Sequence, residues 1–218
     1  MLDLIYAVQA IPKLAVGLSI AVGFTCLALF LSVTGGLILS YIRSFNIRTV
    51  NIIINAYVTY IRGTPLLVQL YLVYYLLPEI GFELPAFVAG LTAFVLNSAA
   101  IMHEVIRGGL SSIPPGQQEA AIAAGMTNRA IWRYITFPQA LIKVLPQIIS
   151  EFTILLKATP LLAFISIVET FRIAQLIYSN NYRPIEVLIG AAIIFFCVNF
   201  SVSRLGIFME KKLAGRGL

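Results

Sequence analysis

Residues 114–138 read PPGQQEAAIAAGMTNRAIWRYITFP and form a polar interruption in a very apolar chain. The segment opens on two prolines, continues through a run of small residues and closes on Phe137 and Pro138. Long connections inside a compact protein are usually functional rather than passive. We therefore expect this segment to be an organised docking element that is presented to a soluble partner.

The composition of the chain predicts a membrane protein. Of its 218 residues, 60% are hydrophobic and only 11% are charged, and the mean hydropathy is +0.94. Soluble domains carry about 25% charged residues. The apolar residues fall in runs of about 18 or more, long enough to cross a bilayer as helices. We predict an all-α integral membrane protein with about five transmembrane helices.

The apolar runs suit one bundle, so residues 1–218 are predicted to form a single domain. The second run is interrupted by Arg62, Gly63, Thr64 and Pro65. Because proline lacks a backbone donor and disfavours helix at the residue before it, we predict a break there. These four residues could act as a hinge or gate, or only as a packing kink. The expected spans cover residues 14–42, 50–77, 85–106, 141–158 and 185–208, with a shorter amphipathic stretch at 161–177.

The net charge of +6 reports orientation rather than nucleic-acid binding, because the basic residues flank apolar spans. They gather after the first span, in the polar segment and in the C-terminal tail, whereas the alternate turns are mainly acidic. Cytoplasmic loops carry the excess of lysine and arginine. We therefore expect an external N-terminus, and a cytoplasmic polar segment and C-terminus. The basic residues that decide this are Arg43, Arg48, Arg107, Arg129, Arg133, Lys211, Lys212 and Arg216; the acidic ones are Asp3, Glu79, Glu83 and Glu186.

Within the polar segment, residues 119–124 are predicted to form a helix because they are rich in alanine. Gly125 is placed to end that helix in the left-handed conformation. Thr127 could cap a second short helix over residues 128–134, which Pro138 would end. The result would be a helix-turn-helix knuckle. The alternative is an ordinary amphipathic loop that lies on the membrane.

The spacing of this segment resembles the EAA loop of ABC importer permeases, with phenylalanine where leucine is usual. In that family the loop forms coupling helices that dock in a cleft of the ATPase subunit. The resemblance implies a cytoplasmic coupling helix between the third and fourth transmembrane helices, within residues 112–138. It also implies that the ATPase is contacted by Glu119, Ala120, Ala121 and Gly125. The matching positions are Glu119, Ala120, Ala121, Gly125, Ile135, Phe137 and Pro138.

Other segments resemble permeases of the polar amino acid type, which carry histidine, glutamine, arginine and related solutes. They are residues 57–69, residues 97–100 with the following 104–109, and residues 155–157, so the resemblance spans roughly residues 10–210. The chain departs from the family at Ala158, where many members have a carboxylate. This departure speaks against a strictly cationic substrate.

The third span carries the strongest candidate for contact with a substrate. Gly90, Asn97 and Glu104 are seven residues apart and share one helical stripe. Asn97 near mid-span is the first choice, with interhelical hydrogen bonding as the alternative. Glu104 could meet an amino group or could instead pair with Arg107.

Further residues of the expected substrate pathway are Ser98, Lys157 and Thr159. Lys157 could attract a carboxylate or form a structural ion pair with Glu151 or Glu104. His103 is the only histidine and is expected to be a satisfied interfacial residue.

No lysine in the chain is followed by serine or threonine, so the phosphate-binding loop of ATPases is absent from the sequence. The chain is expected to be no enzyme and to bind no cofactor, with ATP and magnesium held by a partner. The resemblance implies two ATP-binding subunits, a second permease copy or paralogue and an extracytoplasmic solute-binding protein, in a bacterial inner membrane. Cys26 and Cys197 lie in apolar spans without metal-ligand spacing, so no metal site is expected.

The resemblance implies a permease subunit of an ATP-driven importer for polar amino acids, which forms the translocation pathway and couples it to separate ATPase subunits. One alternative is a permease for another small polar solute, such as an opine-like amino acid derivative. A secondary carrier is less favoured, because such carriers normally contain internal repeats and none is visible here.

Overall fold

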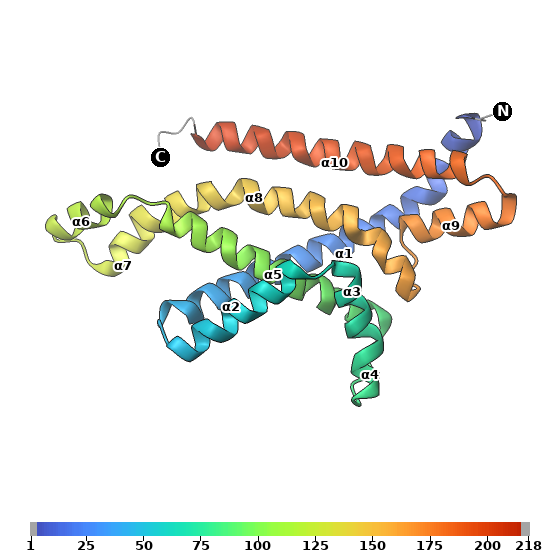
Figure 1. The fold of residues 1–218 in the computed structure, drawn as a ribbon. Helices are drawn as coiled ribbons and strands as arrows, with labels where there is room; N and C mark the ends of the chain where they lie inside the picture. Colours follow the sequence, from blue (N-terminus) through green and yellow to red (C-terminus); the bar gives the residue numbers. More distant parts are fainter. Residues whose placement is uncertain (1–3, 215–218) are drawn as a thin grey trace.

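The computed structural model describes residues 4–214, and all regular structure within that range is helical. The all-α prediction is confirmed. Figure 1 shows long helices packed obliquely, with shorter helices at both ends of the bundle. In chain order the elements are α1 (Leu4–Ser44), α2 (Arg48–Gly63), α3 (Leu66–Tyr71), η1 (Leu72–Leu76), α4 (Leu77–Glu79), α5 (Ala86–Ser111), α6 (Pro115–Ala123), α7 (Asn128–Ile131), η2 (Trp132–Thr136), α8 (Phe137–Ala158), η3 (Thr159–Ile165), α9 (Thr170–Asn181) and α10 (Pro184–Ala214).

Within the described residues, four continuous helical stretches are long and apolar enough to cross a membrane. They are Ile5–Ser44, Ala86–Ser111, Asn128–Ile165 and Pro184–Lys212. The remaining predicted crossing, the second, is built differently. It consists of α2 followed by the shorter apolar stretch Leu66–Glu79.

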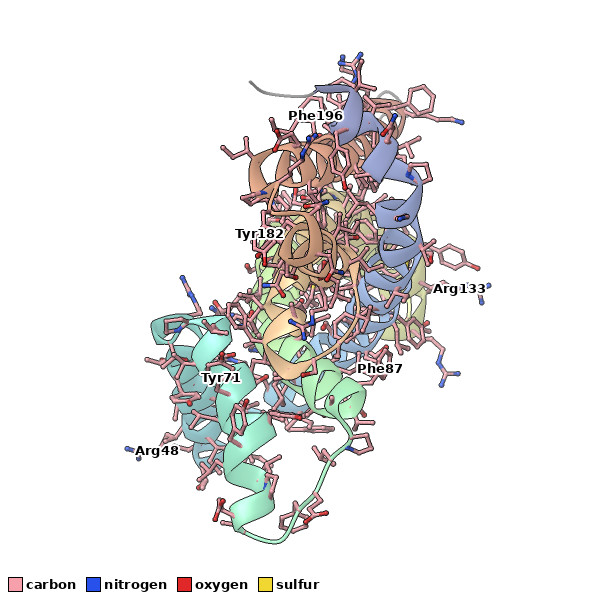
Figure 2. The ribbon with its side chains drawn as sticks, turned by 90° about the vertical axis from the view of Figure 1, so that its right-hand side faces the viewer. Arg48, Tyr71, Phe87, Arg133, Tyr182 and Phe196 are labelled. Atoms are coloured by element: carbon pink, nitrogen blue, oxygen red, sulfur yellow. The ribbon has the colours of Figure 1, made fainter. Side chains whose placement is uncertain are left out.

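The predicted break in the second crossing is confirmed at Thr64 and Pro65. Helix α2 ends at Gly63, and both following residues have extended backbone angles, with ψ values of 142° and 140°. Proline has no N–H to donate to the preceding turn, so the helix stops before it and restarts at Leu66. Figure 2 shows α2 and α3 together at one flank of the molecule, where Tyr71 is labelled.

Two other prolines are accommodated without a break. The π-helical turns η1 and η2 end at Leu76 and Thr136, each two residues before a proline, Pro78 and Pro138. A π turn shifts the hydrogen-bond pattern locally and so relieves the contact between a proline ring and the preceding turn. The prediction that Pro138 ends the second short helix is therefore wrong. The helix continues from α7 through η2 into α8.

Helix α1 crosses α5 at very close range because glycine faces the contact. A Cβ atom added at Gly36 would lie 2.9 Å from the backbone nitrogen of His103. The main core cluster then joins α1, α5 and the end of α8, through Phe24, Phe94 and Leu155. Small residues that allow such close approach are typical of helix packing in membranes.

The two ends of the bundle gather different segments. In Figure 1, α6, α7, the C-terminal end of α10 and the turn between α1 and α2 lie at the left end, and α9 with the N-terminal end of α1 lies at the right end. This arrangement agrees with the alternation expected from the basic residues. Which end faces the cytoplasm stays a prediction.

Candidate functional site

The first half of the polar segment is a short helix with a defined end. Helix α6 ends where Gly125 adopts φ +78°, the left-handed conformation predicted for it. The amide of Gly125 donates to the Ile122 carbonyl at 2.9 Å, and the amide of Met126 donates to the Ala121 carbonyl at 3.1 Å. This pair of bonds is the Schellman motif that satisfies the last carbonyls of a helix.

The second half of the segment begins at a capped helix, as predicted. The hydroxyl oxygen of Thr127 accepts a hydrogen bond from the Ala130 amide at 3.3 Å. The helix then runs on to Ile165 without interruption. From this point the knuckle means residues 112–131. Because the helix that begins within it is continuous, a movement of the knuckle is passed directly into the fourth crossing. Figure 1 shows α6 and α7 projecting from the end of the bundle.

The knuckle is also held to the base of α8 by two side chains. The Gln139 amide donates to the side-chain oxygen of Gln117 at 2.6 Å, and the Lys143 ammonium donates to the Ser112 carbonyl at 2.8 Å. These bonds tie the end of α5 and the first turn of α6 to one helix. The knuckle is therefore a braced element rather than a loose loop.

The exposed face of α6 is where a partner could dock. Glu119 and Ala120 are exposed, and the Ile122 side chain is 60% exposed although it is apolar. Ala121 is buried, so it supports the helix from within and faces no open surface. Of the predicted contact residues, Glu119, Ala120 and Gly125 are accessible in this chain; their contact with an ATPase stays a prediction.

The broken crossing is braced by Gln69, which lies on α3 and is 5% exposed. Its amide nitrogen donates to the Ile61 carbonyl at 3.1 Å, to the Thr64 carbonyl at 3.1 Å and to the Thr64 hydroxyl at 2.9 Å. The carbonyls at the end of α2 thus find a partner that the interrupted helix cannot supply. Of the four predicted hinge residues, Arg62, Gly63 and Pro65 are exposed around this brace and Thr64 is held by it.

The predicted pathway residues of α5 bind neighbouring helices. The Asn97 amide donates to the side-chain oxygen of Gln69 at 3.0 Å. Ser98 is fully buried, and its hydroxyl donates to the Glu151 carboxylate at 2.7 Å. Asn97 therefore makes the interhelical bond that was its alternative interpretation, and a substrate contact at Asn97 or Ser98 stays a prediction.

The remaining pathway candidates lie apart from these. Glu104 forms an ion pair with Arg107 at 2.8 Å, as its alternative interpretation required. Lys157 is exposed, and among the described residues it pairs with neither Glu151 nor Glu104. Thr159 is fully buried and donates to the carbonyl of Leu156 within its own turn.

His103 is fully buried between α1 and α5. Its Nδ1 atom lies 3.0 Å from the hydroxyl of Ser40, so one ring nitrogen is satisfied. The Nε2 atom finds no hydrogen-bond partner within residues 4–214 and lies 3.9 Å from a carboxylate oxygen of Glu104. The histidine is thus a buried packing residue rather than an interfacial one.

A cavity of about 670 Å³ lies elsewhere, between α1, the end of α5 and the start of α8. Its walls include Val33, Leu37, Trp132, Leu141 and Val144. Ser40, Tyr41 and Ser44 also line it, but nearly all of the lining surface is apolar, so the cavity does not suit a polar solute. Asn97, Ser98 and Glu104 lie on α5, whereas Lys157 and Thr159 lie at the end of α8 and the start of η3, and none of these five pathway candidates lines this cavity.

Two buried polar side chains, Gln69 and Glu169, make contacts for which the sequence alone indicated no role. Gln69 could have been found as a lone amide in an apolar run, since such residues need a specific partner inside a membrane. Glu169 is fully buried and caps α9, accepting bonds from the amides of Phe171 and Arg172, both at 2.8 Å. Burial raises the pKa of the Glu169 carboxyl above its usual value, and the two backbone hydrogen bonds only partly oppose that shift.

Comparison with known proteins gives consistent results over almost the whole chain. Residues 32–215 match the family described as "Binding-protein-dependent transport system inner membrane component". The chain is 36% identical to a nopaline transport system permease protein of Agrobacterium fabrum, covering 96% of this chain and 91% of that protein. It is 32% identical to an arginine transport system permease protein of Bacillus subtilis, covering 97% of each. A crystal structure of an amino acid ABC transporter with histidines matches with a TM-score of 0.90 and 35% identity, covering 97% of this chain and 99% of that one.

Proposed function

Because the chain belongs to the family of binding-protein-dependent transport system inner membrane components, we propose that it helps to form the path by which an ATP-driven importer carries a polar amino acid. It is a membrane-spanning permease subunit of an amino acid ABC transporter. Residues 1–218 act as one transmembrane domain in this proposal, with the N-terminus outside and the knuckle in the cytoplasm. Each chain supplies half of the path, which a second permease copy or paralogue completes.

The groups that the knuckle presents indicate which subunit binds ATP. The accessible groups of α6 are the Glu119 carboxylate, glutamine amides, alanines and Ile122, which suit packing into a cleft, and the sequence contains no phosphate-binding loop. Two separate ATP-binding subunits therefore hold ATP and magnesium and grip α6. When they close, the two knuckles approach each other, and the continuous helix from Asn128 to Ile165 carries the movement into the membrane.

The substrate class is proposed from the relatives together with the sequence. The similar proteins transport arginine and nopaline, and the matched structure is an amino acid transporter. Ala158 offers no carboxylate for a cationic side chain. We therefore favour an amino acid with an uncharged polar side chain, which a solute-binding protein delivers. An opine-like derivative is the second candidate, favoured by the nopaline relative.

The observation that carries the proposal is the capped, braced and exposed α6, joined without a break to a crossing helix. The experiment is reconstitution of the permease with its ATPase and binding protein in liposomes. Uptake of a labelled amino acid that requires ATP on the ATPase side supports an importer. Uptake without ATP would instead support a secondary carrier.

A further inference from the structure

Two adjacent residues of α5 each hold a polar side chain from a different neighbouring helix. Asn97 binds Gln69 at the break of the second crossing, at 3.0 Å. Ser98 binds Glu151 of α8, at 2.7 Å. The four residues therefore form a chain that runs from the second crossing through the third to the fourth. We call Gln69, Asn97, Ser98 and Glu151 the polar chain.

The members of the polar chain have few alternative partners. Gln69 is 5% exposed, Glu151 is 2% exposed and Ser98 is fully buried. Inside a bilayer an unpaired polar group costs much more than it does in water, because no solvent replaces the lost bond. Within the part of the chain that the structure describes, the Glu151 carboxylate accepts one hydrogen bond, from the Ser98 hydroxyl. Breaking either hydrogen bond would leave a buried polar group unpaired. This cost favours movement of the paired helices together.

The ends of the polar chain lie at the two places that must move in transport. Glu151 is on the helix that starts at Asn128 in the knuckle, about 35 Å away at 1.5 Å per residue. At the other end, Gln69 holds Ile61 and Thr64, the end of α2 beside the extended break. A displacement of α8 therefore reaches the break through two hydrogen bonds, which the α5 backbone joins at the neighbouring residues Asn97 and Ser98.

We propose that the polar chain positions the broken second crossing according to the state of the knuckle, so that the break opens and closes with the ATPases. Gln69 and Glu151 are its terminal positioning residues, and Asn97 and Ser98 join them through α5. The inference rests on the proposed function, because it needs an ATPase that moves the knuckle. It goes further because it assigns a role to Gln69 and Glu151 and links the break in the second crossing to movement of α8.

The test uses the complete importer in liposomes and measures amino acid moved per ATP hydrolysed. Ser98→Ala cuts the link to α8, and Gln69→Ala cuts the link to the break. Each is expected to keep ATP hydrolysis and to lower the transport ratio by roughly three- to tenfold, the equivalent of about one hydrogen bond. Glu151→Gln still accepts the bond from Ser98, so it is expected to keep the ratio close to that of the native importer.

Ser32→Ala is the matched control. Ser32 is also fully buried in a crossing helix, but among the described residues its hydroxyl has no hydrogen-bond partner. Its removal breaks no link between helices and is expected to leave the ratio unchanged. The variant with both Gln69→Ala and Ser98→Ala is expected to lose no more than the more affected of the two single variants, because one chain can be cut only once.

The possible failures are distinguishable. Native importer without ATP-dependent uptake would overturn the proposed function. Native uptake with Ser98→Ala and Gln69→Ala both at the ratio of Ser32→Ala would overturn the polar chain alone. Single losses that multiply in the double variant, or a Glu151→Gln loss as large as that of Ser98→Ala, would do the same. If Ser98→Ala does not assemble, Gln69→Ala tests the other end and decides the matter by the same ratio.

Discussion

Replacement of Gly125 by alanine tests how the end of α6 is set. Gly125 has φ +78°, and an added Cβ would meet nothing within 4 Å, so the cost comes from the backbone alone. A left-handed residue with a Cβ costs about 1–2 kcal/mol. Alanine also reduces the conformational entropy of the unfolded chain, which offsets roughly 0.4–1 kcal/mol of this cost. The net destabilisation of the Schellman turn is then about 1 kcal/mol, which favours local opening about fivefold.

Hydrogen exchange at the Met126 amide is the direct assay, because that amide closes the turn onto Ala121. We expect its exchange to become about fivefold faster in Gly125→Ala. Gly116→Ala is the matched control, since its Cβ also meets open space but its φ is not positive. There alanine should leave exchange unchanged or slow it, because it is the better helix former. Equal exchange at Met126 in the two variants would refute the reasoning.

Three further predictions follow from other parts of the chain. Single cysteines at Ser112 and Glu83 are expected to label from opposite sides of the membrane in intact cells and inverted vesicles, and labelling from the same side would contradict the orientation. Gly17→Ala would place a Cβ 2.5 Å from a backbone nitrogen at the start of α9, so it should destabilise the purified protein by about 1–3 kcal/mol, whereas Gly23→Ala, with open space around it, should not change the melting temperature. Because the folded state raises the pKa of the Glu169 carboxyl, it binds more protons than the unfolded state, so the contribution of Glu169 to stability falls as pH rises from the ordinary value of 4.5 to the raised one. A melting series over this range should lose that slope in Glu169→Gln, and an unchanged slope would contradict the assignment.

Local chemistry made much of the fold predictable. Pro65 broke the second crossing where expected, because it lacks an N–H. Gly125 ended α6 and Thr127 began the next helix, since each position requires what that residue type offers. The apolar runs located the crossings because only a helix satisfies its own backbone in lipid.

The partners of the polar residues could not be predicted in the same way. Gln69 meets Asn97 across 28 positions, and Ser98 meets Glu151 across 53, and no local pattern specifies such contacts. The helix stripe through Asn97 was visible in the sequence, but what faced it was not. The prediction that Pro138 ends a helix was wrong because the π turn over Trp132–Thr136 precedes it and the helix continues, and the residue type alone does not predict such a turn.

Cross-linking from α6 tests the central claim most directly. In a permease with Cys26 and Cys197 replaced by alanine, Ile122→Cys on the exposed face of α6 would carry a benzophenone label, and Ile47→Cys in the turn between α1 and α2 would serve as control. Ile122 is 60% exposed and Ile47 is 55% exposed, so both labels can reach a neighbour. We expect illumination of the assembled importer to join the Ile122 position to an ATPase subunit, in a yield that changes with ATP, and to join the Ile47 position to it weakly or not at all. The absence of an ATPase cross-link at the Ile122 position in an importer that still transports would contradict the claim that α6 is the joint between permease and motor.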